Sequence, residues 1–331
     1  MKNLVVCYDG TGGEWAHNTN VMATYSLCKK SKSQRVFYDP GVATGGWEYS
    51  MNLEKFLYDF EHGIGTMANV EDGYHFLMKN YNAGDKIFIF GFSRGAFTAR
   101  SLASMVTEIG LLPRHQKNLI PYATRVYNTE HNGNALRAEF ARSFCLNRMP
   151  PIEFVGVWDT VEALTKEAAE RRHNAMLTPN VKCVRHAVAI DEFRPDFRPS
   201  LLETEIANHD EVWFAGAHSD VGGNYKDDRR LSNIALNWML WEARVRGLEL
   251  TANATEIAFN LYPTTSLGRV HNSYFGWESR GAAITRTIPE NALIDYSVVV
   301  RLDNDDIAYA PKNLPDTYRT SFATPMPSDD E

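Results

Sequence analysis

The stretch Gly91-Phe92-Ser93-Arg94-Gly95 separates an apolar segment from a segment with helical periodicity. Residues 85–90 read D-K-I-F-I-F, which predicts a short buried strand. Apolar residues then recur at helical spacing over 96–109, which predicts a helix. A Gly-x-Ser-x-Gly sequence at a strand-to-helix junction is typical of a nucleophile elbow, a tight turn that exposes a serine hydroxyl at a helix N-terminus. Outside this context the same residues form an ordinary turn, so the context makes Ser93 a candidate nucleophile.

The segments around this stretch alternate between strand-like and helix-like patterns. We expect strands at 4–8, 35–38, 85–90, 152–158 and 211–217, and helices at 20–30, 66–81, 96–109 and 231–246. Alternation of this kind is typical of an α/β protein with a mostly parallel, doubly wound sheet and helices on both faces. Two segments are less clear. Residues 181–190 fit a helix at least as well as a strand, and 297–302 fit a short edge strand or a buried connection.

The domain organisation follows from the absence of internal repeats and linkers. We expect a single α/β-hydrolase-like domain over residues 1–312. Residues 114–150 contain many Arg, His, Asn and Glu residues and few strand formers, so they are either an inserted lid or a solvated connection. Residues 313–331 are rich in Pro, Ser, Thr and Asp, which predicts a poorly ordered tail.

Composition excludes several classes of function. The 331 residues carry a formal net charge of −7, which gives no electrostatic basis for binding nucleic acid. The four cysteines lie far apart and form no C-x-x-C pair, which indicates reduced thiols and a protein made in the cytoplasm. We expect neither a Sec-type signal nor a transmembrane segment, because no apolar run is long enough for either.

An acid and a histidine follow the serine, each after a predicted strand. Asp159 follows the strand at 152–158, and His218 follows the strand at 211–217. Serine, aspartate and histidine in this chain order are what a hydrolase triad on an α/β sheet requires. Ser93, Asp159 and His218 are therefore the candidate catalytic residues. Asp191 also follows an apolar run and is the alternative acid.

The first predicted strand ends in Asp9-Gly10-Thr11-Gly12-Gly13. A glycine-rich turn at a strand's carboxyl end lies where open α/β sheets bind their ligands. Backbone N–H groups of Gly10 and Thr11, together with that of Arg94, are therefore candidates for an oxyanion hole. The alternative is an ordinary turn that uses glycine for its backbone freedom.

Three side chains are candidates for contact with substrate. Arg94 places a cation in the first turn of a helix, where the dipole disfavours it, so an acidic neighbour such as Asp9 or an anionic substrate group should offset its charge. Trp47 lies in an aromatic-rich loop that could line a pocket or simply pack well. We therefore assign Asp9, Arg94 and Trp47 to substrate binding.

Two other functions stay open at this point. Asp9, Asp159, His218 and Asp220 all follow strands, so they could hold a divalent cation for metal-dependent hydrolysis. No H-E-x-x-H or comparable spacing supports this, and we predict no metal and no other cofactor. A non-catalytic binding protein on a hydrolase scaffold is the other alternative, because a fold does not fix a function.

Six sequence blocks carry a family resemblance. In order they are Asp9-Gly10-Thr11, Pro40-Gly41-Val42-x-Thr44-Gly45, Gly91-Phe92-Ser93-Arg94-Gly95-Ala96-Phe97-x-Ala99-Arg100, Val155-Gly156-Val157-Trp158-Asp159-Thr160-Val161, His186-Ala187-x-Ala189-Ile190-Asp191-Glu192 and Val212-Trp213-Phe214-Ala215-Gly216-Ala217-His218-Ser219-Asp220-Val221-Gly222-Gly223. Together they resemble the uncharacterised α/β-hydrolase family known as domain of unknown function 2235. This family includes the catalytic domain of bacterial type VI secretion phospholipase effectors.

The resemblance carries implications for fold, site and setting. It implies an α/β-hydrolase fold and hydrolysis of lipid or phospholipid esters, with Ser93, Asp159 and His218 at the matching positions. It also implies a lipid or other ester as the molecular partner, transient contact with a membrane surface, and export by a route other than Sec.

Overall fold

The computed structural model describes residues 1–10, 19–41, 66–129, 133–145, 148–161, 177, 180–202, 206–254 and 263–321. These residues form an eight-stranded sheet in the order β2-β1-β3-β4-β5-β6-β7-β8, and every pair of neighbouring strands is parallel. The strands are β1 (Asn3–Tyr8), β2 (Gln34–Asp39), β3 (Lys86–Phe92), β4 (Phe154–Trp158), β5 (Val184–Ala189), β6 (His209–Phe214), β7 (Ala292–Asp295) and β8 (Tyr318–Ser321). The predicted α/β class and parallel sheet are confirmed.

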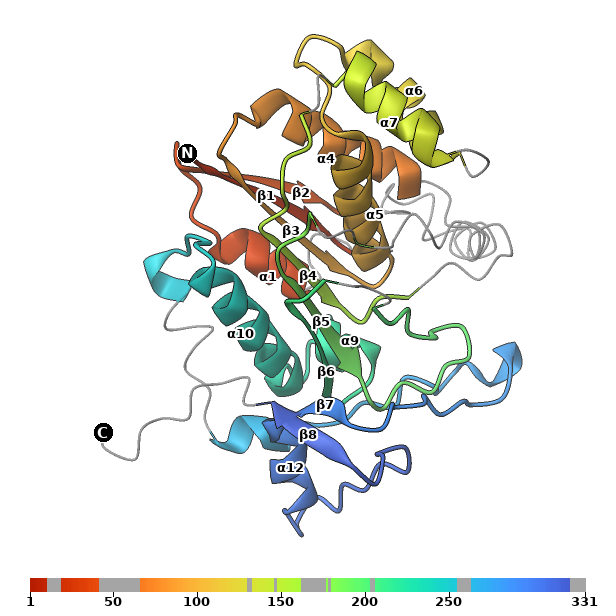
Figure 1. The fold of residues 1–331 in the computed structure, drawn as a ribbon. Helices are drawn as coiled ribbons and strands as arrows, with labels where there is room; N and C mark the ends of the chain where they lie inside the picture. The colour runs from red at the N-terminus through yellow and green to blue at the C-terminus, as the bar shows by residue number, and fades with distance from the viewer. Residues whose placement is uncertain are drawn as a thin grey trace.

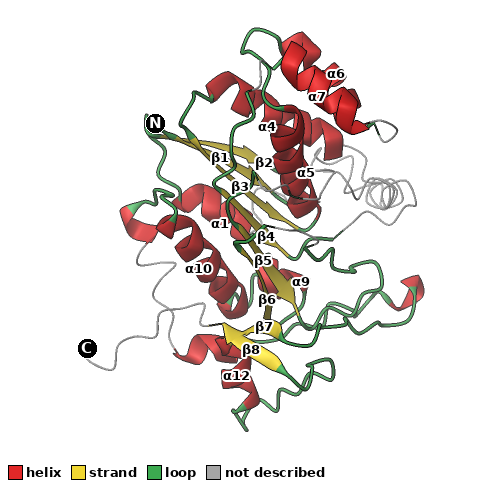
Figure 2. Ribbon diagram, in the orientation of Figure 1, coloured by secondary structure: helices red, strands yellow, loops and turns green. Residues whose placement is uncertain are grey.

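Helices cover both faces of the sheet (Figures 1 and 2). The α-helices are α1 (Asn20–Leu27), α4 (Thr66–Asn80), α5 (Arg94–Ile109), α6 (Ile120–Tyr127), α7 (Gly133–Ser143), α9 (His218–Gly222), α10 (Arg230–Val245) and α12 (Tyr296–Leu302). Short 3-10 helices are η1 (Lys117–Leu119), η3 (Pro263–Leu267) and η4 (Glu278–Arg280). Helices α1 and α10 pack on one face, and α4 and α5 pack on the other.

Strand β3 shows why the sequence selects this layering. Ile87 and Ile89 join the core under α4 and α5, whereas Phe88 and Phe90 join the core under α1 and α10. Successive side chains of a strand point to opposite faces, so an uninterrupted apolar run is buried only in a strand covered on both sides. The D-K-I-F-I-F segment therefore fixes β3 as a central strand.

The order of the strands reverses direction between β1 and β3. The chain passes from β1 outward to β2, then returns to the other side of β1 to form β3 and continues to β8. In open α/β sheets, ligands bind at the carboxyl ends of strands where the order reverses. Gly10 follows β1 and Ser93 follows β3, and an ideal Cβ on Gly10 would lie 3.4 Å from the Ser93 Cβ. The topology therefore brings these two turns together.

Three segments differ from the sequence-based expectations. Residues 181–190, which fit a helix as well as a strand, contain the buried strand β5. Of the two alternatives for 297–302, the edge strand is wrong, because the segment lies in α12 and the Asp295 carboxylate accepts a hydrogen bond from the Ser297 N–H as its N-cap. The expectation of a poorly ordered tail from residue 313 is wrong for 313–321, because β8 pairs with β7 and extends the sheet. Residues 322–331 lie outside the described part.

The segment expected to form a lid or a connection includes α6 and α7. Both helices pack against α5, and α6 also packs against α4. Ile120, Tyr127 and Phe140 belong to the same buried cluster as the inner faces of α4 and α5. In its described part the segment is therefore a packed extension of one helical layer, and a lid over the site stays a prediction.

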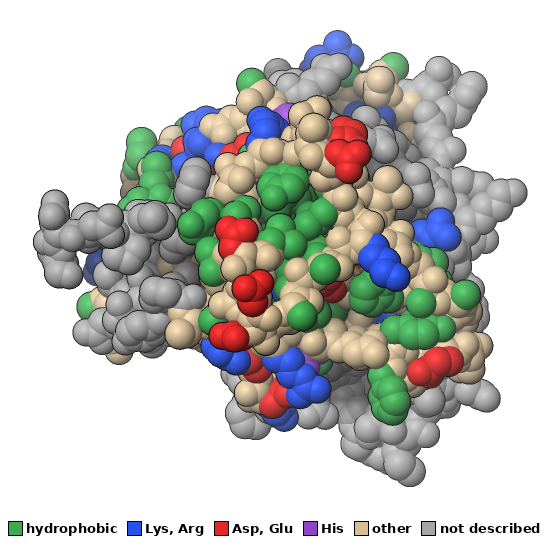
Figure 3. All heavy atoms as spheres, turned by 90° about the horizontal axis from the view of Figure 1, so that it is seen from below, with side chains coloured by type: hydrophobic (Ala, Val, Ile, Leu, Met, Phe, Trp, Pro, Cys, Tyr) green, Lys and Arg blue, Asp and Glu red, His purple; other side chains and the backbone are tan. Residues whose placement is uncertain are grey.

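The molecular surface mixes charges of both signs. Seen from below in Figure 3, acidic and basic side chains are interspersed around apolar ones, and no single sign dominates the described part of this face. A strongly basic patch is what nucleic acid binding requires. Within the described ranges, no helix has both the length and the hydropathy that a membrane span requires.

Candidate active site

Ser93 occupies the turn between β3 and α5. It is the N-cap of α5, with φ 59° and ψ −126°, a backbone conformation that residues other than glycine rarely adopt. The turn is held by glycines: a Cβ on Gly95 would lie 2.4 Å from the carbonyl oxygens of Tyr8 and Asp9, and a Cβ on Gly91 would lie 2.3 Å from the Gly95 oxygen. The two flanking glycines therefore permit the close packing of β1, β3 and α5 on which the sharp turn at Ser93 depends.

Asp159 occupies the corresponding position at the end of β4. Its side chain is fully buried, and its φ of 39° is also positive. The Asp159 N–H donates to the Ala187 carbonyl (2.7 Å), and its Oδ1 accepts from the Ala189 N–H (2.9 Å). Neighbouring β5 therefore fixes both the backbone and the carboxylate of Asp159.

His218 is the first residue of α9, and its ring reaches Asp159. His218 Nδ1 lies 2.6 Å from Asp159 Oδ2. The ring packs against Phe92, with centroids 4.6 Å apart, and against the edge of Phe197 at 4.9 Å. Because Phe92 directly precedes Ser93, this stacking holds the imidazole beside the serine turn.

Two other buried histidines also bind carboxylates, and the first is His186 on β5. Its Nδ1 lies 2.8 Å from Glu211 Oε2, and its Nε2 accepts from the Thr160 N–H at 3.1 Å. Both ring nitrogens are therefore occupied, and His186 ties β4, β5 and β6 together.

The second is His271. Its Nδ1 lies 2.6 Å from Asp220 Oδ1, and its Nε2 lies 3.2 Å from both carboxylate oxygens of Asp227. By contrast, the hydrogen bonds of His218 to described residues use its backbone N–H and its Nδ1, and not its Nε2. Of the three histidine–carboxylate pairs among the described residues, only that of His218 leaves a ring nitrogen available to a substrate or a nucleophile.

Arg286 is part of the site, although the sequence pattern gives no indication of it. Its Nη1 donates to Asp159 Oδ1 at 2.6 Å, and its Nη2 donates to Asp159 Oδ2 at 3.0 Å. The same two groups donate to the carbonyls of Ala189 and Phe197. The Arg286 side chain is fully buried. It is 127 residues from Asp159 in the chain, in a region without clear periodicity, so no local pattern could have identified it.

These contacts shift the pKa values of Asp159 and His218. Burial by itself raises the pKa of Asp159, but the Arg286 charge and the hydrogen bonds from His218 and Arg286 outweigh it and hold that pKa well below its usual range. Burial lowers the pKa of His218, and the Asp159 carboxylate only partly opposes this shift. At neutral pH the pair is therefore a carboxylate beside a neutral imidazole.

The predicted oxyanion donors have different environments. The Arg94 N–H lies in the first turn of α5, directly after Ser93. The Gly10 N–H donates to its neighbour's carboxylate, Asp9 Oδ1, at 2.8 Å, so this donor is already engaged. Thr11 lies outside the described residues.

The structure describes two of the three side chains that we predicted to bind substrate, Asp9 and Arg94. Asp9 Oδ2 accepts from Thr19 Oγ1 at 2.6 Å and from Tyr38 Oη at 2.8 Å, so its carboxylate links the end of β1 to α1 and β2. The Arg94 side chain is buried. Trp47 lies outside the described residues.

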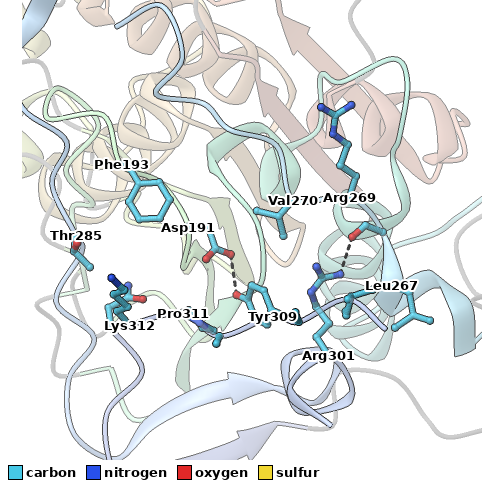
Figure 4. A pocket seen from close by; sticks show the side chains of 15 residues that line it. Asp191, Phe193, Leu267, Arg269, Val270, Thr285, Arg301, Tyr309, Pro311 and Lys312 are labelled. Carbon is cyan, nitrogen blue, oxygen red and sulfur yellow. Dashed lines mark hydrogen bonds between the residues drawn. The ribbon is translucent and has the colours of Figure 1, made fainter. Parts of the chain in front are cut away.

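The alternative acid, Asp191, has other partners. Its Oδ2 accepts from the Gly216 N–H (2.7 Å) and from Tyr309 Oη (2.8 Å). The Tyr309 contact lies in a pocket of about 700 Å³ that Arg301 and Lys312 also line (Figure 4). The structure therefore brings Asp159, and not Asp191, to His218.

The carboxylates considered for a metal site are engaged separately. Asp159 binds Arg286 and His218, whereas Asp220 binds His271 and the Ala217 N–H. Across the described ranges, no group of three or more His, Cys, Asp or Glu side chains is arranged to hold a metal ion.

The parallel sheet, the serine turn after β3 and the acid and histidine after later strands define an α/β-hydrolase-like protein. Residues 2–242 match the family described as "T6SS, Phospholipase effector Tle1-like, catalytic domain". This match spans well over half of the chain, and the chain belongs to that family.

Individual relatives are more distant. The uncharacterized protein YEL023C of Saccharomyces cerevisiae is 28% identical over 239 residues, which are 63% of this chain and 35% of the yeast protein. A structure of the Tle1 effector bound to the VgrG spike of the type 6 secretion system is 20% identical, with a TM-score of 0.41 over 68% of this chain and 51% of that one. An uncharacterized protein from Pseudomonas aeruginosa is 16% identical, with a TM-score of 0.49 over 86% of this chain and 51% of that one. The chain thus spans about a third of the yeast protein and about half of each solved structure.

Proposed function

We propose that this protein is a serine hydrolase that cleaves acyl esters, with lipid or phospholipid esters as its substrates. Ser93 is the nucleophile, His218 the general base and Asp159 the residue that orients the imidazole. The observation that carries the proposal is the 2.6 Å contact between His218 Nδ1 and Asp159 Oδ2, with the ring stacked on the residue that precedes Ser93.

In the first half of the reaction, Ser93 Oγ attacks the ester carbonyl carbon and its proton passes to His218 Nε2. The tetrahedral intermediate collapses, and the alcohol leaves with that proton, which forms the acyl-enzyme. Water then attacks the acyl group with His218 again as base, which releases the carboxylic acid and restores the Ser93 hydroxyl. Asp159 stays ionised throughout and stabilises the imidazolium.

The oxyanion hole in this proposal includes the Arg94 N–H at the start of α5. The second donor comes from the turn after β1. Since the Gly10 N–H is engaged by Asp9, we assign this role to Thr11. Removal of one such donor typically costs about 3 to 4 kcal/mol of transition-state stabilisation.

Family membership supports the substrate class. The description of the family names a phospholipase effector, so we propose a lipid ester as the substrate. We also propose transient contact with a membrane surface and export as an effector by a route other than Sec. The serine turn at the reversal of strand order is where such a substrate would bind.

An ester panel tests the proposal. Wild type and Ser93→Ala are assayed on p-nitrophenyl esters of increasing chain length and on phospholipid vesicles, with fatty acid release as the readout. We expect the substitution to reduce turnover at least about 10³-fold, because removal of the nucleophile leaves only residual catalysis.

A fluorophosphonate probe provides the control. The probe should label wild type at Ser93 and leave Ser93→Ala unlabelled, with identical circular dichroism spectra for the two proteins. A wild type that binds vesicles but neither hydrolyses an ester nor takes up the probe is a binding protein, and hydrolysis by Ser93→Ala at the wild-type rate rules out the triad.

A further inference from the structure

The candidate active site contains a buried cation that the proposed reaction does not use. Arg286 and Asp159 make a forked pair, in which two guanidinium N–H groups bind the two carboxylate oxygens. Both side chains are fully buried, and the His218 side chain is only 5% exposed. Charges excluded from water interact strongly, so the effect of Arg286 on its neighbours is not screened away.

We propose that Arg286 is a positioning residue that acts through Asp159 to keep His218 a neutral base down to a lower pH than an Asp–His pair alone would allow. This inference rests on the proposed function of Ser93, Asp159 and His218, and it adds the pH range over which they work.

The geometry explains the direction of the effect. His218 Nδ1 and Arg286 Nη2 bind the same oxygen, Asp159 Oδ2. An isolated carboxylate beside a buried imidazole favours the imidazolium form. Here the guanidinium offsets the carboxylate charge, so the imidazole faces a nearly neutral pair and gains less from protonation. The fork also prevents the carboxylate from rotating, which fixes the direction of the His218 ring.

Two other charged groups near His218 act in opposite directions, since Arg194 lowers its pKa and Glu192 raises it. Glu192 Oε2 accepts the His218 backbone N–H at 3.2 Å, and the Arg194 guanidinium pairs with the same Glu192 carboxylate. Asp220, also on α9, is bound to His271. Arg286 contacts Asp159 and not His218 in the described ranges, so its effect on the imidazole passes through the Asp159 carboxylate. In agreement, burial lowers the pKa of His218, and Asp159 raises it too little to restore its usual value.

The experiment compares pH profiles of kcat/KM. Arg286→Gln removes the charge and keeps a hydrogen-bonding group, whereas Arg286→Lys keeps the charge and loses the fork. Arg280→Gln is the matched control, because Arg280 lies nearby in the chain but pairs with Asp196.

We expect Arg286→Gln to shift the acid limb of the kcat/KM profile to a pH about one unit higher. At acidic pH this shift lowers kcat/KM about tenfold. Arg286→Lys should keep the limb near its wild-type position, and Arg280→Gln should not move it. An unshifted limb in Arg286→Gln, or an equal shift in Arg280→Gln, overturns the inference. A purely structural role would lower activity at every pH without moving the limb.

A direct titration of His218 tests the inference without an activity measurement. The ¹³Cε1 NMR signal of His218, assigned by comparison with His218→Gln, is followed against pH in the wild type, Ser93→Ala, Arg286→Gln and Arg280→Gln. We expect a midpoint below the ordinary histidine value of about 6.5 in the wild type and Ser93→Ala, and a midpoint about one pH unit higher in Arg286→Gln but not in Arg280→Gln. A midpoint above about 7 overturns the inference even where Arg286→Gln does not fold. If Arg286→Gln raises the midpoint and Arg280→Gln does not, but no ester is hydrolysed, the proposed function fails and the role of Arg286 stands.

Discussion

At the residue scale, the candidate site concentrates backbone strain. Ser93 and Asp159 both have positive φ, at 59° and 39°, although neither is glycine. Conformations of this kind cost about 1–3 kcal/mol each and persist only where the surroundings enforce them. Ser93 is enforced by the close packing of β1 and α5, and Asp159 by its hydrogen bonds to β5. The backbone strain is thus located at the two residues that the proposed mechanism requires to be held in fixed positions.

Asp159→Asn should impair both activity and folding. The neutral amide leaves the buried Arg286 guanidinium without its counter-charge, which we expect to reduce the free energy of unfolding by about 3–5 kcal/mol. Turnover should fall on the order of 10⁴-fold, because an amide no longer stabilises the imidazolium. Urea unfolding and the ester assay measure the two effects.

Ser93→Ala is the comparison for this variant. It removes one hydroxyl that makes no capping hydrogen bond to α5, so its unfolding free energy should stay within about 1 kcal/mol of wild type. If Asp159→Asn were equally stable, Arg286 would not depend on Asp159 for its charge compensation.

At the scale of elements, the junction of β3 with α5 depends on a close approach of backbones. Gly95 lies in the first turn of α5, where its Cα faces the carbonyls that end β1. Central strands cannot shift without disturbing the sheet on both sides. The geometry of the serine turn is therefore coupled to the packing of α5 on β1.

Gly95→Ala should reduce the free energy of unfolding by about 3 kcal/mol, because its Cβ would lie 2.4 Å from the backbone oxygens of Tyr8 and Asp9. Gly84→Ala is the control. Gly84 has φ +88° but no atom within 4 Å of an added Cβ, so only the backbone penalty of about 1 kcal/mol applies. Chemical denaturation of both variants measures the difference, and equal costs would show that the approach of α5 to β1 is not tight.

At the scale of the whole molecule, the end of the described chain is tied to the site. Asn313 Nδ2 donates to the carbonyls of Ile190 and Arg286, and β8 completes the sheet beside β7. Tyr318 and Leu314 pack on the small core of β6, β7 and α12. Residues 313–321 therefore help to hold the segment that carries Arg286.

A chain that ends at Lys312 should be less stable than one that ends at Ser321. The shorter chain loses β8, the apolar contacts of Tyr318 and both Asn313 hydrogen bonds. We expect its melting temperature to be lower by about 5 °C or more, since a domain of this size loses about 2–4 °C per kcal/mol. Equal melting temperatures in thermal denaturation would show that β8 contributes nothing to the fold.

The sequence by itself determined the α/β class, the serine turn and the positions of Asp159 and His218 at strand ends. The periodicity of each segment depends only on the residues of that segment. The order of the segments can be read directly from the chain. The same local rules were wrong for 297–302, where β-branched residues suggested a strand and the Asp295 cap instead begins a helix.

Only the tertiary structure decided which histidine keeps a free ring nitrogen, which acid it binds, and that Arg286 completes the pair. It also showed that the Gly10 N–H is engaged by Asp9. The physical reason is that hydrogen bonds and charge compensation in a buried site join residues far apart in the chain. Such contacts leave no periodic trace in the segments that contribute them.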